Sequence, residues 1–402
     1  MHNEAPPAMW PAAAQPTIDE RWAESRSALV EQLRDEIEAG GPMTFARYMA
    51  LALYDPADGY YMTSDDRPSR AGDYLSAPEL HPIFGATLAA QIEEVWARLD
   101  RPATMTLREE AAGSGALIEP LLVALEPAVL EAVRYVPIES SAGREADVRV
   151  RVAAAGHGAN LADPATTDLP MTGVVIANEL LDALPVHRVT MRDGRLQELH
   201  VGWRDGWFTE EALPPSIPEL QDSLERIGIR LEEGQVGEIG LAAQAWMRLL
   251  AERLERGLAV LIDYGHAAAD LYDPVRRPGG LLRTYRHHHA GDDAYRFVGE
   301  QDITAHVDWT TLERVATDAG LTVLGRTTLA EYLTGLGLGD RLLRWQSRPG
   351  VTKDRYIAAR AAVVRLLDPQ ALGGFGVLIV ARGIDPQPVL QGLGFRLTRA
   401  GY

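Results

Sequence analysis

Three polar residues follow a short apolar run near the middle of the chain. The run is residues 173–177 (GVVIA), and Asn178, Glu179 and Asp182 come shortly after it. Asn178 can present an amide N–H and a carbonyl oxygen together. Glu179 and Asp182 are three residues apart, so on a helical turn they would lie on one side and bind a cation as paired carboxylates. The alternative is a helix N-terminus with Asn178 as its cap and acidic residues in the first turn.

A second group combines a stretch of small side chains with carboxylates. Residues 109–115 read EEAAGSG and lie between an apolar run and a helical pattern, while Glu139 ends the next apolar run. Small residues let the backbone approach a ligand, and an acidic residue about 20 positions further on can hold ribose hydroxyls. The alternatives are a plain tight turn and a surface glutamate. Together the signals predict a nucleoside-containing cofactor, either a nicotinamide nucleotide or S-adenosylmethionine.

Apolar runs alternating with helical patterns would position these groups. Helical patterns cover residues 115–125 and 239–256. This alternation is typical of a doubly wound α/β sheet, in which ligands bind at the carboxyl ends of the strands. The seven candidate strands are residues 104–109, 134–139, 148–154, 173–177, 258–263, 321–326 and 376–381.

The first hundred residues have a helical pattern instead. Apolar periodicity predicts helices over residues 19–40, 45–54 and 82–99, and Thr44 is placed to cap the second of them. Residues 1–17 are rich in Pro and Ala, which predicts a flexible tail.

Three further segments lie outside the alternating pattern. Residues 62–79 form a polar loop whose length is typical of functional or disordered loops. Residues 187–213 predict a β-meander, because Asp-Gly pairs at 193–194 and 205–206 separate strand-like runs. Residues 266–310 are polar and rich in turns. The last two segments follow strands at the ligand-binding edge, so we expect them to act as substrate lids.

Composition narrows the class of protein. The chain has 402 residues, no cysteine, 46% hydrophobic residues and a net charge of −18, which predicts a globular protein of two or three domains, or one large domain with insertions. The negative charge argues against nucleic acid and favours a cationic partner. No apolar run is long enough for a membrane helix. The absence of cysteine and of a signal-peptide pattern predicts a cytoplasmic location.

Some candidate residues have two open interpretations. Asp263 ends an apolar run and either reaches the pocket or hydrogen-bonds a loop. Asp302, His306 and Asp308 either orient a substrate or brace a lid, and bracing is favoured. The adjacent histidines at 287–289 are not expected to bind a metal, because neighbouring residues on one chain rarely face the same ion.

The motifs, taken in order, resemble a known family, the MidA-type class I S-adenosylmethionine-dependent methyltransferases. That family includes the mitochondrial complex I assembly factor that methylates a protein arginine. The motifs NELLDALPV and GDYLSAPE carry the resemblance most specifically. The whole series is FARYMALALYDPADGYY (45–61), RAGDYLSAPELHPIFG (70–85), EEAAGSGAL (109–117), ANELLDALPV (177–186), LIDYG (261–265), GEQDITAHVDW (299–309) and GGFGVLIVAR (374–383).

The resemblance implies a Rossmann-like, seven-stranded methyltransferase sheet with an antiparallel final strand. It implies that S-adenosylmethionine is the cofactor, that Glu139 holds its ribose, that the loop containing Gly72 and Asp73 closes over the site, and that residues 178–182 line the methyl-transfer region. Because paired carboxylates can bind and orient a cationic acceptor, Glu179 and Asp182 are the expected catalytic residues. The cofactor-binding residues that the resemblance implies are Gly72, Asp73, Glu109, Ala111, Gly113, Gly115, Glu139 and Asn178.

The sequence departs from the family pattern at three places. Ala111 stands where the family has its first glycine, and Glu110 occupies a position that is normally apolar. The Phe-Thr pair that usually follows Gly-Asp is replaced by residues 74–76 (YLS).

These observations predict a methyltransferase that acts on a cationic nitrogen such as a protein arginine, and a homodimer is compatible with them. The alternatives are a non-catalytic assembly factor with the same fold, a methyltransferase of a small molecule or peptide, and a nicotinamide-dependent oxidoreductase. The expected organisation is a tail (1–17), an N-terminal helical region (18–100), a cofactor-binding core (101–186, 236–265 and 311–383), inserted lid segments (187–235 and 266–310) and a C-terminal tail (384–402).

Overall fold

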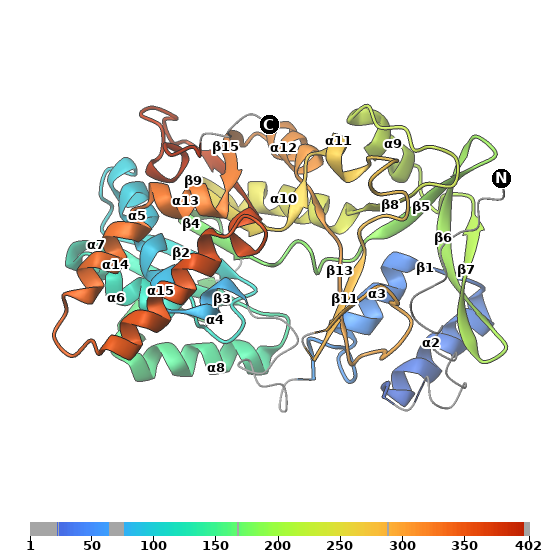
Figure 1. Cartoon of the computed structure of the whole chain (residues 1–402), viewed down its shortest axis with the longest axis horizontal. Helices are drawn as coiled ribbons and strands as arrows, with labels where there is room; N and C mark the ends of the chain where they lie inside the picture. The colour runs from blue at the N-terminus through green and yellow to red at the C-terminus, as the bar shows by residue number, and fades with distance from the viewer. Residues whose placement is uncertain (1–21, 23, 64–75, 167–168, 288, 398–402) are drawn as a thin grey trace, which may run out of the picture.

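A six-stranded mixed sheet forms the core of the left-hand half of the molecule as drawn in Figure 1. The computed structural model describes residue 22 and residues 24–63, 76–166, 169–287 and 289–397. The strand order is β15-β16-β9-β4-β2-β3; β3, β2, β4 and β9 run parallel, and β16 is antiparallel to both of its neighbours. The strands are β2 (Met105–Glu110), β3 (Val133–Ile138), β4 (Met171–Asn178), β9 (Leu254–Asp263), β15 (Thr322–Thr328) and β16 (Gly376–Arg382).

The predicted strand at residues 148–154 is wrong. Most of it belongs to helix α8 (Ala142–Val152), which continues into a π-helical turn. The alternating valines suggested a strand, but Val148 and Val152 are also four residues apart, so a helix buries both on one face. Val150, between them, is 68% exposed. Beyond β3, the described residues add to the sheet only a single bridge from Leu161 to Tyr135, so they form six strands and not seven.

Helices cover both faces of this sheet, which explains why its strands are almost continuously apolar. Val174 and Ile176 of β4 pack on one side, and Val175 and Ala177 pack on the other. The first side is covered by α5 (Ile83–Arg98), α6 (Ile118–Ala124), α13 (Leu329–Gly335) and α15 (Lys353–Leu367). The second side is covered by α10 (Leu241–Arg253) and α12 (Trp309–Asp318).

A second sheet confirms the predicted meander. Asp193 and Asp205 have φ angles of 51° and 52°, and each is followed by a glycine with positive φ, as tight two-residue hairpin turns require. Helices α2 (Ser27–Gly40) and α3 (Phe45–Tyr54) pack against this sheet, and the Thr44 side chain caps α3 as predicted. The strands are β1 (Met43–Thr44), β5 (His187–Arg192), β6 (Arg195–Arg204), β7 (Trp207–Leu213) and β8 (Val236–Ile239).

The segment 266–310 lies between the two sheets, where β11 and β13 are labelled in Figure 1. Its small sheet has the order β12-β11-β13, from β11 (Arg283–Arg286), β12 (His289–Gly291) and β13 (Asp302–Thr304). A short parallel pair, β10 (Gly265–His266) and β14 (Val307–Asp308), joins it to the end of β9. In the part of the chain that the structure describes, no helix has the length and apolar character needed to cross a membrane.

Candidate active site

The loop after β2 has an unusual backbone conformation that its small residues permit. Ala111, Gly113 and Gly115 have φ angles of +53°, +58° and +71°. A side chain at Gly115 would lie 3.3 Å from a methyl group of Val148, whereas the position of a Cβ on Gly113 is open. The loop therefore exposes backbone at Gly113 to which a ligand has access.

The two predicted carboxylates beside this loop have different environments. Glu139 accepts a hydrogen bond from the backbone N–H of Gly113, and partial burial raises its pKa. Glu109 lies buried below the loop and accepts a hydrogen bond from the Tyr135 hydroxyl at 2.6 Å. Burial raises the pKa of Glu109 to about 8. Glu139 thus faces the loop, whereas Glu109 supports it from inside the sheet.

Glu110, at a position that is normally apolar in the family pattern, also has a structural explanation. Its side chain is buried and pairs with Arg108 of the same strand, with 2.5 Å between Oε1 and Nε. Residues two apart on a strand point to the same face, so the positive charge of Arg108 and the negative charge of Glu110 neutralise each other inside the protein. The presence of Glu110 instead of an apolar residue therefore does not change the side of the loop that faces a ligand.

Residues 178–185 form an irregular turn. No helix begins there, so the interpretation of Asn178 as a helix cap is wrong, as is the expectation of a helical turn. Glu179 has a φ of +53°, which redirects the chain at the end of β4. The Asn178 amide donates to Glu179 Oε1 at 2.9 Å.

Asp263 at the end of β9 holds this turn in place. Its Oδ2 accepts hydrogen bonds from the backbone N–H groups of Leu181 at 2.8 Å and Asp182 at 3.3 Å. Its Oδ1 accepts from the N–H of Tyr264 at 2.9 Å. Of the two interpretations of Asp263, the loop hydrogen-bonder is confirmed. A carboxylate ending the strand next to the predicted site was the available sequence signal for this role.

The turn presents an acidic and acceptor-rich surface. Burial, followed by the charge of Asp182, raises the pKa of Glu179 to about 8. Burial also raises the pKa of Asp182 to about 6, although a hydrogen bond from the Tyr264 side chain opposes the rise. Asn178 Oδ1 and Asp182 Oδ1 are buried and accept no hydrogen bond from the residues that the structure describes. Buried acceptors of this kind are costly unless a donor meets them.

A short helix, α4 (Ala77–Leu80), connects the two parts of the site. Its Glu79 accepts a hydrogen bond from Ser114 of the glycine-containing loop at 3.1 Å, and its Ala77 N–H donates to Glu179 at 3.3 Å. The helix belongs to the end of the predicted closing loop. The predicted cofactor residues Gly72 and Asp73 lie outside the described residues.

A family model described as "Putative S-adenosyl-L-methionine-dependent methyltransferase" matches residues 87–327, which is more than half of the chain. The chain belongs to this methyltransferase family. The resemblance seen in the motifs is confirmed, and the matched range includes the glycine-containing loop, Glu139 and the turn at 178–185.

Relatives of this methyltransferase agree with the assignment. The chain is 28% identical to the protein arginine methyltransferase NDUFAF7 homolog of Drosophila melanogaster, over 78% of this chain and 76% of that protein. The human protein arginine methyltransferase NDUFAF7 is 24% identical, over 78% and 74%. A crystal structure of a "likely methyl transferase" from Burkholderia thailandensis, bound to S-adenosyl-homocysteine, is 32% identical with a TM-score of 0.82, covering 95% of this chain and 98% of that one.

The protein is therefore an S-adenosylmethionine-dependent methyltransferase, which excludes the nicotinamide-dependent alternative. Its own residues fit that cofactor. Gly113 leaves room for a ligand against the backbone, and Glu139 stands beside it. In the turn at 178–185, the Oδ1 atoms of Asn178 and Asp182, which have no partner among the described residues, leave room for a donor.

The predicted cytoplasmic location is contradicted. The curated relatives named above, from Drosophila melanogaster and from Homo sapiens, are both named as mitochondrial proteins. The absence of cysteine was therefore a poor guide to compartment, because thiol content constrains only the redox chemistry that a chain can tolerate.

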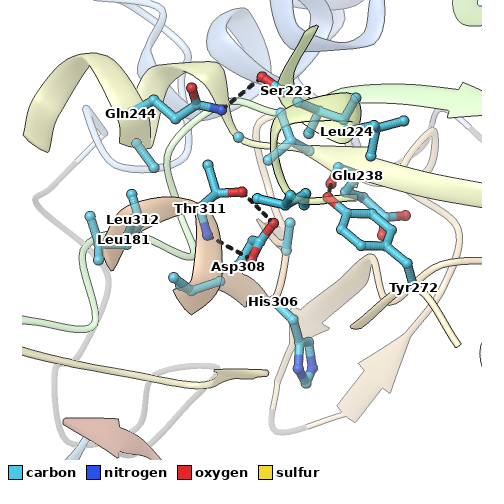
Figure 2. A pocket seen from close by; sticks show the side chains of 17 residues that line it. Leu181, Ser223, Leu224, Glu238, Gln244, Tyr272, His306, Asp308, Thr311 and Leu312 are labelled. Carbon is cyan, nitrogen blue, oxygen red and sulfur yellow. Dashed lines mark hydrogen bonds between the residues drawn. The ribbon is translucent and has the colours of Figure 1, made fainter. Parts of the chain in front are cut away.

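A small pocket lies against the 178–185 turn, and Leu181 of that turn is one of its lining residues (Figure 2). Its volume of about 30 Å³ has room for water but not for a cofactor. Asp308 lines it and accepts hydrogen bonds from the backbone and hydroxyl of Thr311 at 3.1 and 2.7 Å, which caps α12. The expectation that Asp308 braces this segment is confirmed, and in Figure 2 the His306 ring points away from the other lining side chains.

Proposed function

We propose that this methyltransferase transfers the methyl group to a cationic nitrogen, the side chain of a protein arginine. The observation that carries the proposal is a pair of buried acceptors to which none of the described residues donates, Asn178 Oδ1 and Asp182 Oδ1, beside the carboxyl of Glu179. A guanidinium has five N–H donors and no acceptor, so it complements this surface. The printed names of the curated relatives, which are protein arginine methyltransferases, support a protein acceptor.

In this proposal the loop after β2 and the end of β3 hold the cofactor. Backbone at Ala111, Gly113 and Gly115 contacts it, and Glu139 accepts hydrogen bonds from its ribose hydroxyls. Glu109 supports the loop from below. S-adenosylmethionine, when bound, supplies a methyl group on a positively charged sulfonium, so the main task of the protein is to align the acceptor nitrogen with that methyl group.

Glu179 and Asp182 bind the acceptor and take up its proton. A guanidinium must lose a proton around the time of transfer, because its pKa is far above neutral. Burial raises the pKa of Glu179 to about 8 and of Asp182 to about 6, which brings both close to the working pH of a general base. The backbone contacts of Asp263 keep the turn that carries both groups in one orientation.

We also propose that the segments 187–235 and 266–310 act as lids over the core formed by 101–186, 236–265 and 311–383. The contacts of the second segment with the site support this role: Ala305 N–H donates to the Asp182 carbonyl at 2.9 Å, and Val307 N–H donates to the Tyr264 carbonyl at 3.0 Å.

The test uses amide substitutions, which keep shape and remove charge. Glu179→Gln and Asp182→Asn should leave S-adenosylmethionine affinity within about threefold, under ~1 kcal/mol. They should reduce methyl transfer by roughly 10² or more, as the loss of a positioned acid–base group typically does. The assay follows labelled methyl groups from S-adenosylmethionine into arginine-containing peptides and cell-extract proteins, with methylarginine identified after hydrolysis.

Asp308→Asn is the matched control, because it removes a carboxylate from the cavity side and keeps a residue type that caps helices well. It should transfer methyl groups at the wild-type rate. Wild-type turnover in both amide variants would contradict the assigned roles. Label recovered in a small molecule or peptide instead of methylarginine would replace the proposed acceptor and leave the methyltransferase activity intact.

A further inference from the structure

A series of side-chain contacts connects Asp302 of β13 with the turn that carries Asp182. The Tyr61 hydroxyl donates to Asp302 Oδ1 at 2.7 Å. The rings of Tyr61 and Tyr54 stack with centroids 5.5 Å apart and an interplanar angle of 26°. The Tyr54 hydroxyl then donates to the carbonyl oxygen of Ala183, the residue after Asp182, at 3.0 Å. Residues from the end of α3 and from β13 are thereby tied to the proposed acceptor site.

Two more tyrosines complete this cluster. Tyr285 of β11 is the direct cross-strand partner of Asp302 in the antiparallel pair, so the two side chains lie on the same face. Tyr264 follows Asp263 at the end of β9, and its side chain hydrogen-bonds Asp182. Three segments of the chain, namely α3 with the turn after it, the end of β9 and β11, therefore place aromatic rings beside the two carboxylates.

The charges of the cluster agree with this placement. After burial, which is the largest cause for all four tyrosines, Asp182 and Asp302 each raise the pKa of the hydroxyl of Tyr54, Tyr61 and Tyr285. They do the same for Tyr264. The four phenols therefore stay neutral and act as donors and aromatic faces.

Among the described residues, the charged groups around the cluster are mainly carboxylates. Arg283, on the same face of β11 as Tyr285, lowers the pKa of that tyrosine and opposes the carboxylates there, and Arg144 lowers the pKa of Glu139. Glu139 contributes to the rise in the pKa of Tyr54, so the cluster also adjoins the cofactor side of the site. With Glu179 and Asp263 next to Asp182, carboxylates outnumber these arginines.

We propose that Asp302 and Tyr61, with Tyr54 and Tyr285, form the outer wall of the acceptor site and select a flat cation, the guanidinium of an arginine side chain, over a compact ammonium group. A planar guanidinium stacks on aromatic faces and forms two parallel hydrogen bonds with a carboxylate, whereas an ammonium group does neither as well. This inference rests on the proposed function and extends it to residues that are distant in sequence from the methyl-transfer turn.

The experiment measures binding without turnover. The protein is saturated with S-adenosylhomocysteine and titrated calorimetrically with Nα-acetyl-arginine amide, its neutral isostere Nα-acetyl-citrulline amide, and Nα-acetyl-lysine amide. The wild-type protein should prefer the arginine probe at least tenfold over each of the other two. Asp302→Asn keeps an acceptor for the Tyr61 hydroxyl and removes the negative charge. This variant and Tyr61→Leu should each reduce the affinity for the arginine probe at least tenfold. Both should leave S-adenosylhomocysteine affinity within about threefold.

Two comparison variants separate the possible failures. Asp308→Asn, from the same segment but facing the small pocket, should bind the arginine probe like the wild type. If Asp182→Asn weakens the arginine probe while Asp302→Asn and Tyr61→Leu do not, the outer wall is wrong and the proposed function stands. If the wild-type protein does not distinguish arginine from citrulline, the cationic acceptor itself is wrong, and this inference falls with it.

Discussion

Ala111 stands where the family pattern has a glycine, and it adopts the conformation that glycine would adopt. Its φ is +53°, and the glycines at 113 and 115 continue the same left-handed course. A left-handed L-residue costs about 1–2 kcal/mol, so the loop keeps its shape against a local penalty. The substitution therefore affects the stability of the loop more than its geometry.

Ala111→Gly should stabilise the protein. Relief of the left-handed penalty outweighs the extra flexibility of glycine in the unfolded chain, so the free energy of unfolding should rise by roughly 0.5–1 kcal/mol. Urea denaturation followed by circular dichroism measures this change. Ala112→Gly is the control, because Ala112 is buried, has no positive φ and should lose about 1 kcal/mol. A destabilised Ala111→Gly protein would show that the alanine is not strained.

Among the elements, the turn at 178–185 depends most on support from outside itself. Beyond Asn178, the last residue of β4, it has no regular secondary structure. The Asp263 carboxylate, at the end of the adjacent strand β9, accepts hydrogen bonds from the backbone N–H groups of Leu181, Asp182 and Tyr264. Burial, followed by the charges of Asp182 and Glu179, raises the pKa of Asp263, and the N–H donors of Leu181 and Tyr264 oppose that rise. Asp263 is thus a positioning residue for the groups proposed to bind the acceptor.

Asp263→Asn should destabilise the protein and slow methyl transfer. The amide NH₂ would face a backbone N–H that now donates to a carboxyl oxygen, so the free energy of unfolding should fall by about 1.5–3 kcal/mol. Single-turnover rates should fall at least tenfold, while S-adenosylhomocysteine affinity, measured by calorimetry, changes less than threefold. Equal losses of cofactor affinity and rate would instead indicate that the whole sheet edge had collapsed.

At the scale of the molecule, the site is formed where three bodies meet. The carboxyl ends of β2, β3, β4 and β9 supply the carboxylates and the glycine-containing loop, α3 and the turn after it supply Tyr54 and Tyr61, and β11 and β13 supply Tyr285 and Asp302. A ligand bound at the proposed site would contact all three, and because it would bind only the folded chain, its binding would add to the stability of that state.

S-adenosylhomocysteine should raise the melting temperature of the protein, and NAD should not. At about 100 times its dissociation constant a ligand adds about 2.7 kcal/mol to the stability of the folded state. Glu139→Ala should weaken the binding of S-adenosylhomocysteine by about 1.5–3 kcal/mol, the range for hydrogen bonds to a charged group. The ligand should therefore raise the melting temperature of this variant by less. Glu145→Ala is the control, because that residue pairs with Arg149 on α8. If S-adenosylhomocysteine raised the melting temperature of Glu139→Ala as much as that of the wild type, the ribose would be bound by another residue.

The amino-acid sequence by itself determined the elements whose signals are local. Six of the seven expected sheet strands formed, because strands buried on both faces are continuously apolar over a few residues. The meander was predictable because Asp-Gly turns require conformations that few residues adopt. The same local reasoning placed Glu139, Asn178 and Glu179 at strand ends, since parallel strands meet ligands at their carboxyl edge.

Only the tertiary structure decided how distant segments meet. Valines alternating at 148–152 fit a strand or a helix, and packing of Val148 and Val152 on the sheet selected the helix. Tyr61 and Asp302 are 241 residues apart, and no local periodicity links them. Their contact exists because α3 and β13 pack into one shared apolar cluster, which brings their polar side chains to the same edge of the main sheet. A contact between such distant residues depends on the burial of the apolar faces of α3 and β13 against each other, which happens only when the chain folds.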